Sequence, residues 1–293
     1  MKKVSHMQKI AQSLVSSWLP IRPRDIYKNK LGRVLCIGGN ENMGGAIILA
    51  GGAALNSGAG LVTIASHQAN RSALHARHPE IMFVDYDNSD QLAEQIKIAD
   101  TILLGPGLGR EKSDQQLVQM VLDSCTDHQS VIIDADGLYH LAHLLSEDSH
   151  FELSKQTILT PHLGEWEKLT HLSPADENIT DNIAWRDQLN AAIVLKKERT
   201  EIYLTQECWQ NTAGNPSMAT GGMGDTLAGM IAGFIGQYEN KKQAILSAVY
   251  LHSYIADQLA ETHYVTLPSQ IIAHIPEYMA KFKRDKEEYL NEK

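Results

Sequence analysis

The 293-residue sequence has few cysteines and no long apolar run. Its three cysteines, Cys36, Cys125 and Cys208, are far apart and form no C-x-x-C pair, which argues against a disulfide framework and favours a reducing compartment. No stretch approaches about 18 consecutive apolar residues, and polar residues follow Met1, so we predict neither a membrane span nor a signal peptide. We therefore expect a cytoplasmic protein with no membrane partner.

Positive charge is also scarce, because 26 Lys and Arg stand against 35 Asp and Glu, a formal net charge of −9. Nucleic acids are bound mostly through Lys and Arg, so this balance disfavours nucleic acid as the main partner. A small anionic ligand needs only a local site and stays compatible with it. With 43% hydrophobic residues, the chain can bury a sizeable core without disulfides or metals.

Short apolar runs rich in Ile, Val and Leu alternate with helical patterns. The runs predict strands at 34–37, 61–65, 101–104, 131–133, 157–159 and 192–195, and the amphipathic patterns predict helices at 46–56, 115–122, 181–189 and 243–262. This alternation predicts an α/β fold of three αβα layers, a mostly parallel central sheet with helices on both faces. Two strands without a helix between them, 200–205 and 207–211, predict an antiparallel hairpin at the sheet edge.

Both ends of the chain are predicted to belong to one domain covering residues 1–293. Residues 5–19 have the pattern of a short amphipathic helix, and residues 20–32 contain two prolines and several charges, typical of a connecting loop. The last 13 residues, 281–293, carry nine charges of both signs. That composition predicts a solvated helix end or a frayed tail.

The clearest chemical signal is the glycine-rich run around Asp225. Gly221, Gly222 and Gly224 surround this carboxylate, and an amphipathic run at 226–235 follows, which predicts a loop leading into a helix N-terminus. Backbone amides and the helix dipole favour an anion there, and glycines let phosphate approach the backbone. Asp225 could then take a proton from a hydroxyl that attacks phosphorus. A plain N-cap beside a tight turn is the alternative.

A second segment, T-P-H-L-G-E at 160–165, directly follows a predicted strand. Ligands of open α/β sheets bind at such strand ends, so His162 could donate a hydrogen bond to a phosphate or to a ligand amide. Glu165 could hold a magnesium ion through water. An ordinary helix start with Glu165 in its first turn explains the same spacing.

A third segment, Lys196, Lys197, Glu198, Arg199 and Thr200, lies between two predicted strands. Such a polar turn can hold the phosphate or ribose of a nucleotide through Lys and Thr side chains. An exposed charged hairpin is the alternative.

Three glycine or aspartate loops follow other predicted strands. The loop at 38–46 has the spacing G-G-x4-G-G, not G-x-G-x-x-G, and no acidic residue closes the next strand, so a dinucleotide-dependent oxidoreductase is disfavoured. Its glycines could make room for a flat ligand.

The G-P-G-L-G loop at 105–109 either touches a ligand or turns the chain. In D-A-D-G, Asp134 or Asp136 could contact a ligand or metal, or Asp136 could cap a helix.

The order of these motifs along residues 32–237 resembles the NAD(P)H-hydrate dehydratase family within the ribokinase-like superfamily. The resemblance implies an enzyme, a hydro-lyase, that restores NADH or NADPH from their hydrated forms at the expense of ADP or ATP. The ring hydroxyl is phosphorylated, and the phosphate then leaves. Mg²⁺ is the implied cofactor. A homo-oligomer, with the tetramer as one form, and a hydrate epimerase on a separate chain are the implied partners.

The resemblance also implies roles for individual positions. Asp225 matches the family's base, and with it Ala46, Gly107 and His162 match the hydrate site. The nucleotide site is matched by Lys196, Lys197, Glu198, Arg199, Thr200, Gly222 and Gly224.

The sequence departs from the family pattern at several places. Lys197 stands where glycine is usual, Met223 replaces Thr in G-G-T-G-D, and Leu163 replaces Pro. Tyr27-Lys28-Asn29 stands in place of His-Lys-Gly. These changes leave the choice between ADP and ATP open.

Two rival functions remain at this stage. One is a small-molecule kinase of the same superfamily, acting on a hydroxymethylpyrimidine or hydroxyethylthiazole, although such kinases typically carry Asn at the position of His162. The other is a catalytically idle nucleotide-binding protein, against which the intact Asp225 argues.

Overall fold

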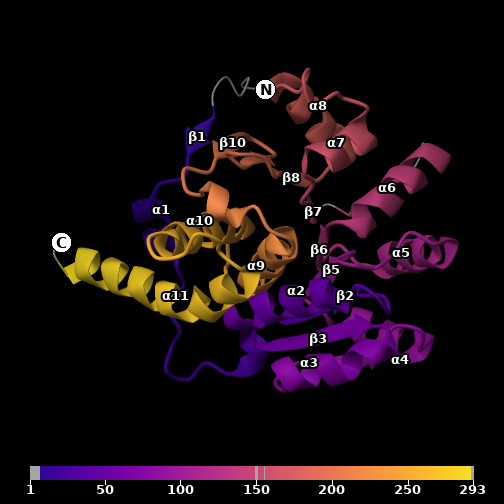
Figure 1. The fold of residues 1–293 in the computed structure, drawn as a ribbon, viewed down its shortest axis with the longest axis horizontal. Helices are drawn as coiled ribbons and strands as arrows, with labels where there is room; N and C mark the ends of the chain where they lie inside the picture. The colour runs from indigo at the N-terminus through magenta and orange to yellow at the C-terminus, as the bar shows by residue number, and fades with distance from the viewer. Residues whose placement is uncertain (1–6, 149–150, 155, 292–293) are drawn as a thin grey trace.

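A ten-stranded sheet runs through the molecule (Figure 1). The computed structural model describes residues 7–148, 151–154 and 156–291. In spatial order, the strands are β1 (Gln8–Lys9), β10 (Glu207–Gln210), β9 (Glu201–Leu204), β8 (Ala192–Leu195), β7 (Thr157–Leu159), β6 (Ser130–Ile133), β5 (Thr101–Leu104), β2 (Arg33–Ile37), β3 (Leu61–Ser66) and β4 (Met82–Asp85). All pairs from β8 to β4 are parallel, and β9 is antiparallel to both of its neighbours. The predicted mostly parallel sheet and its edge hairpin are confirmed.

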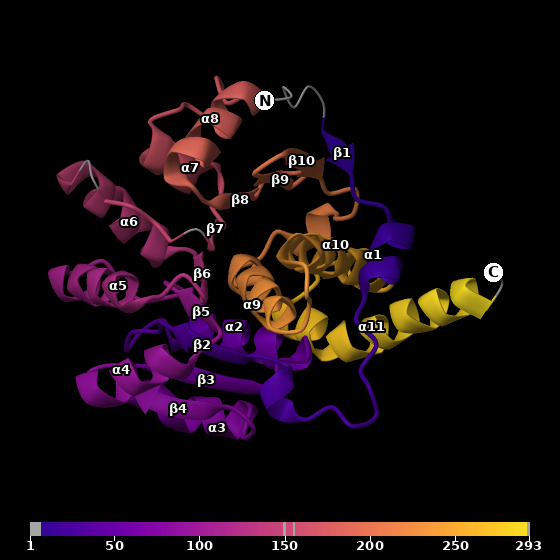
Figure 2. The ribbon, with the colours of Figure 1, turned by 180° about the vertical axis from the view of Figure 1, so that it is seen from behind.

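Helices cover both faces of this sheet, which confirms the predicted three layers (Figures 1 and 2). One face carries α1 (Gln12–Trp18), α2 (Gly44–Asn56), α9 (Met223–Ile235), α10 (Lys241–Ala260) and α11 (Pro268–Asn291). The other carries α4 (Ser89–Ile98), α5 (Lys112–Ser124), α6 (Asp136–Glu147), α7 (Leu163–Thr170) and α8 (Ile179–Leu189). The short α3 (Arg71–Arg77) contributes Leu74 to the core around α2.

The N-terminal segment differs from its prediction. The predicted helix at 5–19 is confirmed only as α1, because Gln8 and Lys9 pair in parallel with β10. The Ile10 amide also donates to the Gln210 carbonyl at 3.0 Å, and the Ile10 side chain is fully buried. A strand edge that offers free backbone groups therefore overrides the local helical pattern. Residues 5 and 6 lie outside the described residues.

The charged C-terminal segment is one of the two predicted forms, a helix end, but part of it is buried. It continues α11 as far as Asn291, and Phe282 within it is fully buried against the rings of Tyr250 and Tyr254. The Lys286 ammonium donates to the Leu19 carbonyl at 2.8 Å. The predicted helix end is therefore confirmed, but it is not wholly solvated, because the buried Phe282 anchors a stretch in which most other residues are charged. Residues 292–293 lie outside the described range.

Glycines bring α2 and α9 into unusually close contact. A Cβ atom added to Gly229 would lie 2.1 Å from the Ala50 carbonyl oxygen, and one added to Gly233 would lie 2.6 Å from that of Ala54. Only glycine allows such an approach of two helix backbones. This contact fixes the start of α9 relative to α2, and therefore fixes the two glycine-rich segments that these helices carry at their N-termini.

Candidate functional site

Helix α9 begins at a glycine that its backbone conformation requires. Gly222 is the N-cap with φ of 91°, in the left-handed region that side chains disfavour, and its carbonyl accepts from the Thr226 amide at 3.0 Å. Asp225 lies in the first helical turn. Helix geometry leaves the first amides of this turn without partners inside the helix. The predicted loop leading into a helix N-terminus is confirmed.

Asp225 lies in an environment that disfavours its charge. Burial, together with the charges of Asp134 and Asp136, raises its pKa to about 6, although Lys196 opposes the shift. A carboxylate with such a pKa is ionised at neutral pH and still takes up a proton readily. These are the properties that general-base catalysis requires.

An ion pair lies beside the start of α9. Lys196 follows β8, Asp134 follows β6, and the Lys196 ammonium contacts the Asp134 carboxylate at 2.7 Å. Asp134 is only 1% exposed and also accepts from the Thr160 hydroxyl at 2.8 Å. Burial works against the charge of Lys196, but Asp134 and Glu165 outweigh it and raise the pKa of Lys196. A Cβ on Gly224 would lie 3.1 Å from this ammonium, so glycine keeps the space beside it open.

His162 and Glu165 form a capping box at the start of α7. The His162 ring nitrogen Nδ1 accepts from the amides of Gly164 at 3.0 Å and Glu165 at 3.2 Å, while Glu165 Oε2 accepts from the His162 amide at 2.8 Å. The alternative of an ordinary helix start is therefore correct in local terms. The remaining ring nitrogen of His162 lies 3.4 Å from Glu165 Oε1.

Besides capping α7, Glu165 lies close to the ion pair of Lys196 and Asp134. Burial raises its pKa to about 7, while Lys196, whose ammonium lies 3.9 Å from Glu165 Oε2, opposes the shift. The pKa of His162 is lowered, by burial first and by the charge of Lys196 second. Both side chains therefore face the charged centre formed by Lys196 and Asp134.

A cavity of about 720 Å³ opens beside this centre. Its wall contains most of the predicted nucleotide-site residues together with His162, namely His162, Lys196, Lys197, Glu198, Arg199, Thr200 and Gly224. Gly222 caps the helix and is not part of this wall. Three buried polar residues of the wall, Asn211, His252 and Ser253, were not predicted as site residues. His252 and Ser253 lie inside a helix with an ordinary amphipathic pattern and carry no motif.

Lys197, the departure from the family pattern, is held by two carboxylates. Its ammonium contacts Glu201 at 2.7 Å and Glu177 at 3.0 Å. Glu201 also accepts from the Tyr203 hydroxyl at 2.6 Å. The extra positive charge is therefore neutralised within the protein, and the Lys197 side chain ties the turn between β8 and β9 to Glu177.

The other two predicted hydrate-site positions lie next to each other. A Cβ on Gly107, whose φ is 61°, would lie 3.0 Å from the Cβ of Ala46. The Gly107 carbonyl accepts from the Asn40 amide at 2.7 Å, and the Asn70 side chain donates to the carbonyls of Gly39 at 2.8 Å and Asn40 at 3.1 Å. Asn70 was not predicted, and nothing in its sequence surroundings singles it out.

A cavity of about 530 Å³ lies at these loops, with Asn40, Met43, Gly109, Arg110 and Asp136 in its wall. The Arg110 guanidinium pairs with Asp136 at 2.8 Å. Lys196 in the wall of the first cavity acts to lower the pKa of Asp225, and Asp136 in the wall of the second acts to raise it. Asp225 is therefore coupled electrostatically to the walls of both cavities.

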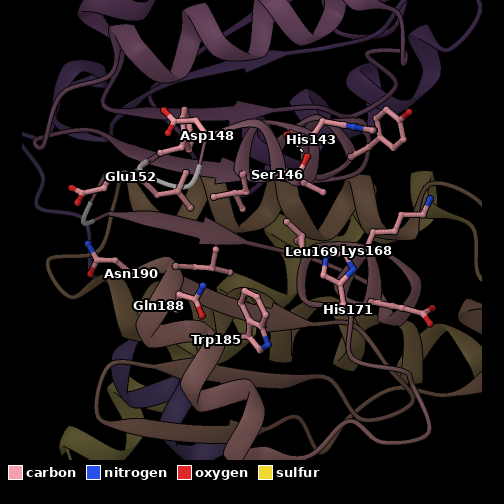
Figure 3. A pocket seen from close by; sticks show the side chains of 17 residues that line it. His143, Ser146, Asp148, Glu152, Lys168, Leu169, His171, Trp185, Gln188 and Asn190 are labelled. Carbon is pink, nitrogen blue, oxygen red and sulfur yellow. Dashed lines mark hydrogen bonds between the residues drawn. The ribbon is translucent and has the colours of Figure 1, made fainter.

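A larger cavity, of about 990 Å³, lies elsewhere, among α6, α7 and α8 (Figure 3). Its wall includes His143, Lys168, His171 and Trp185, and it contains no residue of the sequence motifs. Within the described ranges, no cluster of three or more His, Cys, Asp or Glu side chains is arranged to ligate a metal. No helix in those ranges is long and apolar enough to cross a bilayer.

The fold defines an α/β protein of the ribokinase-like class. A ribokinase-like protein from Enterococcus faecalis superimposes with a TM-score of 0.90 at 42% identity, covering 94% of this chain and 96% of that one. A hydroxyethylthiazole kinase from Pyrococcus horikoshii, with a TM-score of 0.60 at 12% identity, shares the fold alone.

The chain belongs to the NAD(P)H-hydrate dehydratase family, whose model matches residues 34–277. An ADP-dependent (S)-NAD(P)H-hydrate dehydratase from Listeria monocytogenes is 46% identical over 281 residues, 96% of this chain and 99% of the relative. An ADP/ATP-dependent NAD(P)H-hydrate dehydratase from Bacillus subtilis, co-crystallised with ATP/Mg²⁺, is 30% identical with a TM-score of 0.83, covering 95% of this chain and 99% of that one.

Proposed function

We propose that this protein is an ADP-dependent hydro-lyase that restores NADH or NADPH from their hydrated forms. The single observation that carries the proposal is Asp225, a carboxylate with a pKa of about 6 in the first turn of α9, coupled to the walls of two cavities. The near full-length likeness to relatives named for this activity supports it.

The nucleotide occupies the 720 Å³ cavity. Lys196 and the amides at the start of α9 hold its terminal phosphate, and the turn from Lys197 to Thr200 borders the rest. The hydrated nicotinamide ring enters from the side of Ala46 and Gly107, with His162 between the two ligands. This arrangement leaves the ring hydroxyl close to Asp225.

In the first step, Asp225 takes the proton of the ring hydroxyl while the hydroxyl oxygen attacks the terminal phosphorus. The bond between that phosphorus and its bridging oxygen breaks, so that ADP leaves as AMP. In the second step, the phosphorylated ring expels inorganic phosphate and loses a proton, which restores the dihydropyridine double bond. Phosphorylation therefore converts a poor leaving group, hydroxide, into a good one.

The family likeness implies Mg²⁺. The carboxylates of the site are already engaged, so they leave room for the ion only through bridging water molecules. Asp134 is already paired with Lys196, and Glu165 Oε2 accepts from the His162 backbone. Glu165 would therefore hold the ion through water and the nucleotide's phosphates. When bound, the ion would neutralise charge on the transferring phosphoryl group.

The proposal also covers the epimerase partner, the cellular location and the oligomeric state of the protein. A bifunctional hydrate-repair enzyme from Vibrio cholerae matches this chain at 35% identity over only 52% of its own length. We expect the epimerase partner of the present protein to be a separate chain. We also expect a cytoplasmic homo-oligomer, such as a tetramer.

The direct test is a repair assay with purified protein, the hydrate of NADH or NADPH, and ADP and ATP in parallel. We expect the absorbance of the dihydropyridine to return with stoichiometric release of inorganic phosphate. A small-molecule kinase would instead phosphorylate a thiamin-precursor alcohol and leave the hydrate unchanged. No recovery with either nucleotide contradicts the proposal.

A further inference from the structure

Two buried polar atoms in the wall of the nucleotide cavity have no hydrogen-bond partner among the described residues. They are Oδ1 of Asn211, which directly follows β10, and Nε2 of His252 on α10. The two side chains are only 2% and 4% exposed. A buried polar atom without a partner destabilises the folded protein unless a ligand or water supplies the missing bond. These atoms therefore indicate which chemical groups the cavity receives.

The Asn211 amide has a fixed orientation. Its Nδ2 donates to the Ala213 carbonyl at 3.1 Å and to the Ser253 hydroxyl at 2.8 Å, so both of its protons are used. Its backbone amide donates to the Thr200 carbonyl at 2.8 Å, which fixes the residue beside the predicted nucleotide turn. Oδ1 can only accept. The missing partner of Asn211 must therefore be a hydrogen-bond donor.

His252 presents an acceptor as well. Burial lowers its pKa to about 4, and the charge of Lys196 adds to this, so the ring is neutral at physiological pH. A hydrogen bond with the Met223 backbone favours the protonated ring, which means that the ring donates it. Because Nε2 has no partner, that donor is Nδ1. A neutral imidazole that donates through Nδ1 accepts through Nε2.

Two neighbouring acceptors do not suit the phosphates of the nucleotide, since ionised phosphate oxygens accept and do not donate. The nucleoside part does carry donors, namely the ribose hydroxyls and the exocyclic amine of adenine. We propose that Asn211 Oδ1 and His252 Nε2 are specificity-determining atoms that accept hydrogen bonds from the nucleoside of the donor nucleotide. The inference rests on the proposed function, since it requires a nucleotide in this cavity.

The test compares the binding of ADP, 2′-deoxy-ADP, 3′-deoxy-ADP and inosine diphosphate to the unaltered protein by calorimetry. We expect at least one analogue to bind about tenfold more weakly than ADP, because the lost donor leaves a buried acceptor unpaired. Weaker binding of a deoxy analogue identifies the ribose, and weaker binding of inosine diphosphate identifies the base. Equal affinity for all four nucleotides overturns the inference and leaves the proposed function intact, whereas no binding of ADP overturns both.

Variants of α10 provide a second readout. His252→Phe keeps the ring volume and removes the acceptor, so its affinity for ADP should fall about tenfold and its discrimination against the sensitive analogue should shrink. Ser247→Ala, at a buried position of the same helix outside the cavity wall, is the matched control and should bind ADP as the unaltered protein does. Undiminished discrimination in a folded His252→Phe protein removes His252 from the proposal.

Discussion

Two cavities of this protein, the one among α6, α7 and α8 and the one beside α9, differ in what lines them. The cavity among α6, α7 and α8 is the larger of the two, at about 990 Å³, but polar and charged wall residues such as Glu152, Lys168 and His171 are solvent-exposed (Figure 3). The cavity beside α9 is smaller, at about 720 Å³, yet buried Asn211 and His252 line it and Lys196 is only 19% exposed there. Polar groups removed from water are costly, and a protein retains them where a ligand compensates.

The volume of a cavity is therefore a poor guide to its chemistry. A wall of exposed side chains is already solvated and gains little from a ligand. A wall in which charges and acceptors are buried gains a hydrogen bond or a charge interaction from each correctly placed ligand atom. The following changes test this contrast, beginning with the one expected to have the largest effect.

Asp225→Asn should abolish almost all turnover. The amide has the shape of the carboxylate but cannot take the hydroxyl proton, so we expect a loss on the order of 10²–10⁴-fold in kcat. ADP should still bind with nearly unchanged affinity, because Lys196 and the helix amides hold the phosphate. Steady-state repair kinetics and calorimetry measure the two quantities separately. A variant that retains full activity would show that Asp225 is not the base.

The pH dependence of the reaction should report the same carboxylate. Asp225 acts as a base only when ionised, and its pKa is raised to about 6, so kcat/KM should fall about tenfold per pH unit below that value and level off above it. Glu165, whose pKa is raised to about 7, is the competing explanation. If Asp225 is the responsible group, the pH profile of kcat/KM for Glu165→Gln should still change slope near pH 6. A profile without this change of slope would assign the titration to Glu165.

Much of the site could be predicted from the sequence because its parts are local. A glycine run before an amphipathic segment makes a helix N-terminus, and a short buried strand followed by T-P-H-L-G-E places His162 at the sheet's C-terminal edge. Both features depend on neighbours in the sequence. The same holds for the alternating strands and helices of the sheet.

The missed features depend on contacts between distant segments. The sequence around His252 shows only an ordinary amphipathic helix, and the role of His252 emerges when α10 packs beside Lys196. Asn70 gains its role only by bonding to a loop about 30 residues away. Residues 8–9 carry a helical pattern, but the open edge of β10 recruits them into the sheet. The helix end at 281–291 is one of the two predicted forms, but its partial burial was missed for the same reason, since Phe282 is buried only after α11 packs against α10.

The close contact between α2 and α9, which positions the start of α9 beside the smaller cavity, can be tested by measuring the stability of variants. A Cβ at Gly229 would lie 2.1 Å from a backbone oxygen of α2, so Gly229→Ala should lower the free energy of unfolding by about 1–3 kcal/mol and displace the start of α9. Gly45→Ala in α2 is the matched control, because its Cβ would meet nothing within 4 Å. Helix propensity makes that change neutral or slightly stabilising. Denaturant unfolding measures both, and equal stability of the two variants would refute the close α2–α9 contact.

The smallest effect is expected in the larger cavity. His143→Ala removes an exposed side chain of α6 that lines the 990 Å³ cavity with Lys168 and His171 but lines neither the 720 Å³ nor the 530 Å³ cavity. Turnover and ADP affinity should stay within about twofold of the unaltered protein, since surface changes away from special features cost little. The assay is the same repair reaction, which makes the result directly comparable with Asp225→Asn. A tenfold loss of turnover in a folded His143→Ala protein would mean that the larger cavity takes part in the reaction, and that burial of polar groups does not separate the two cavities by function.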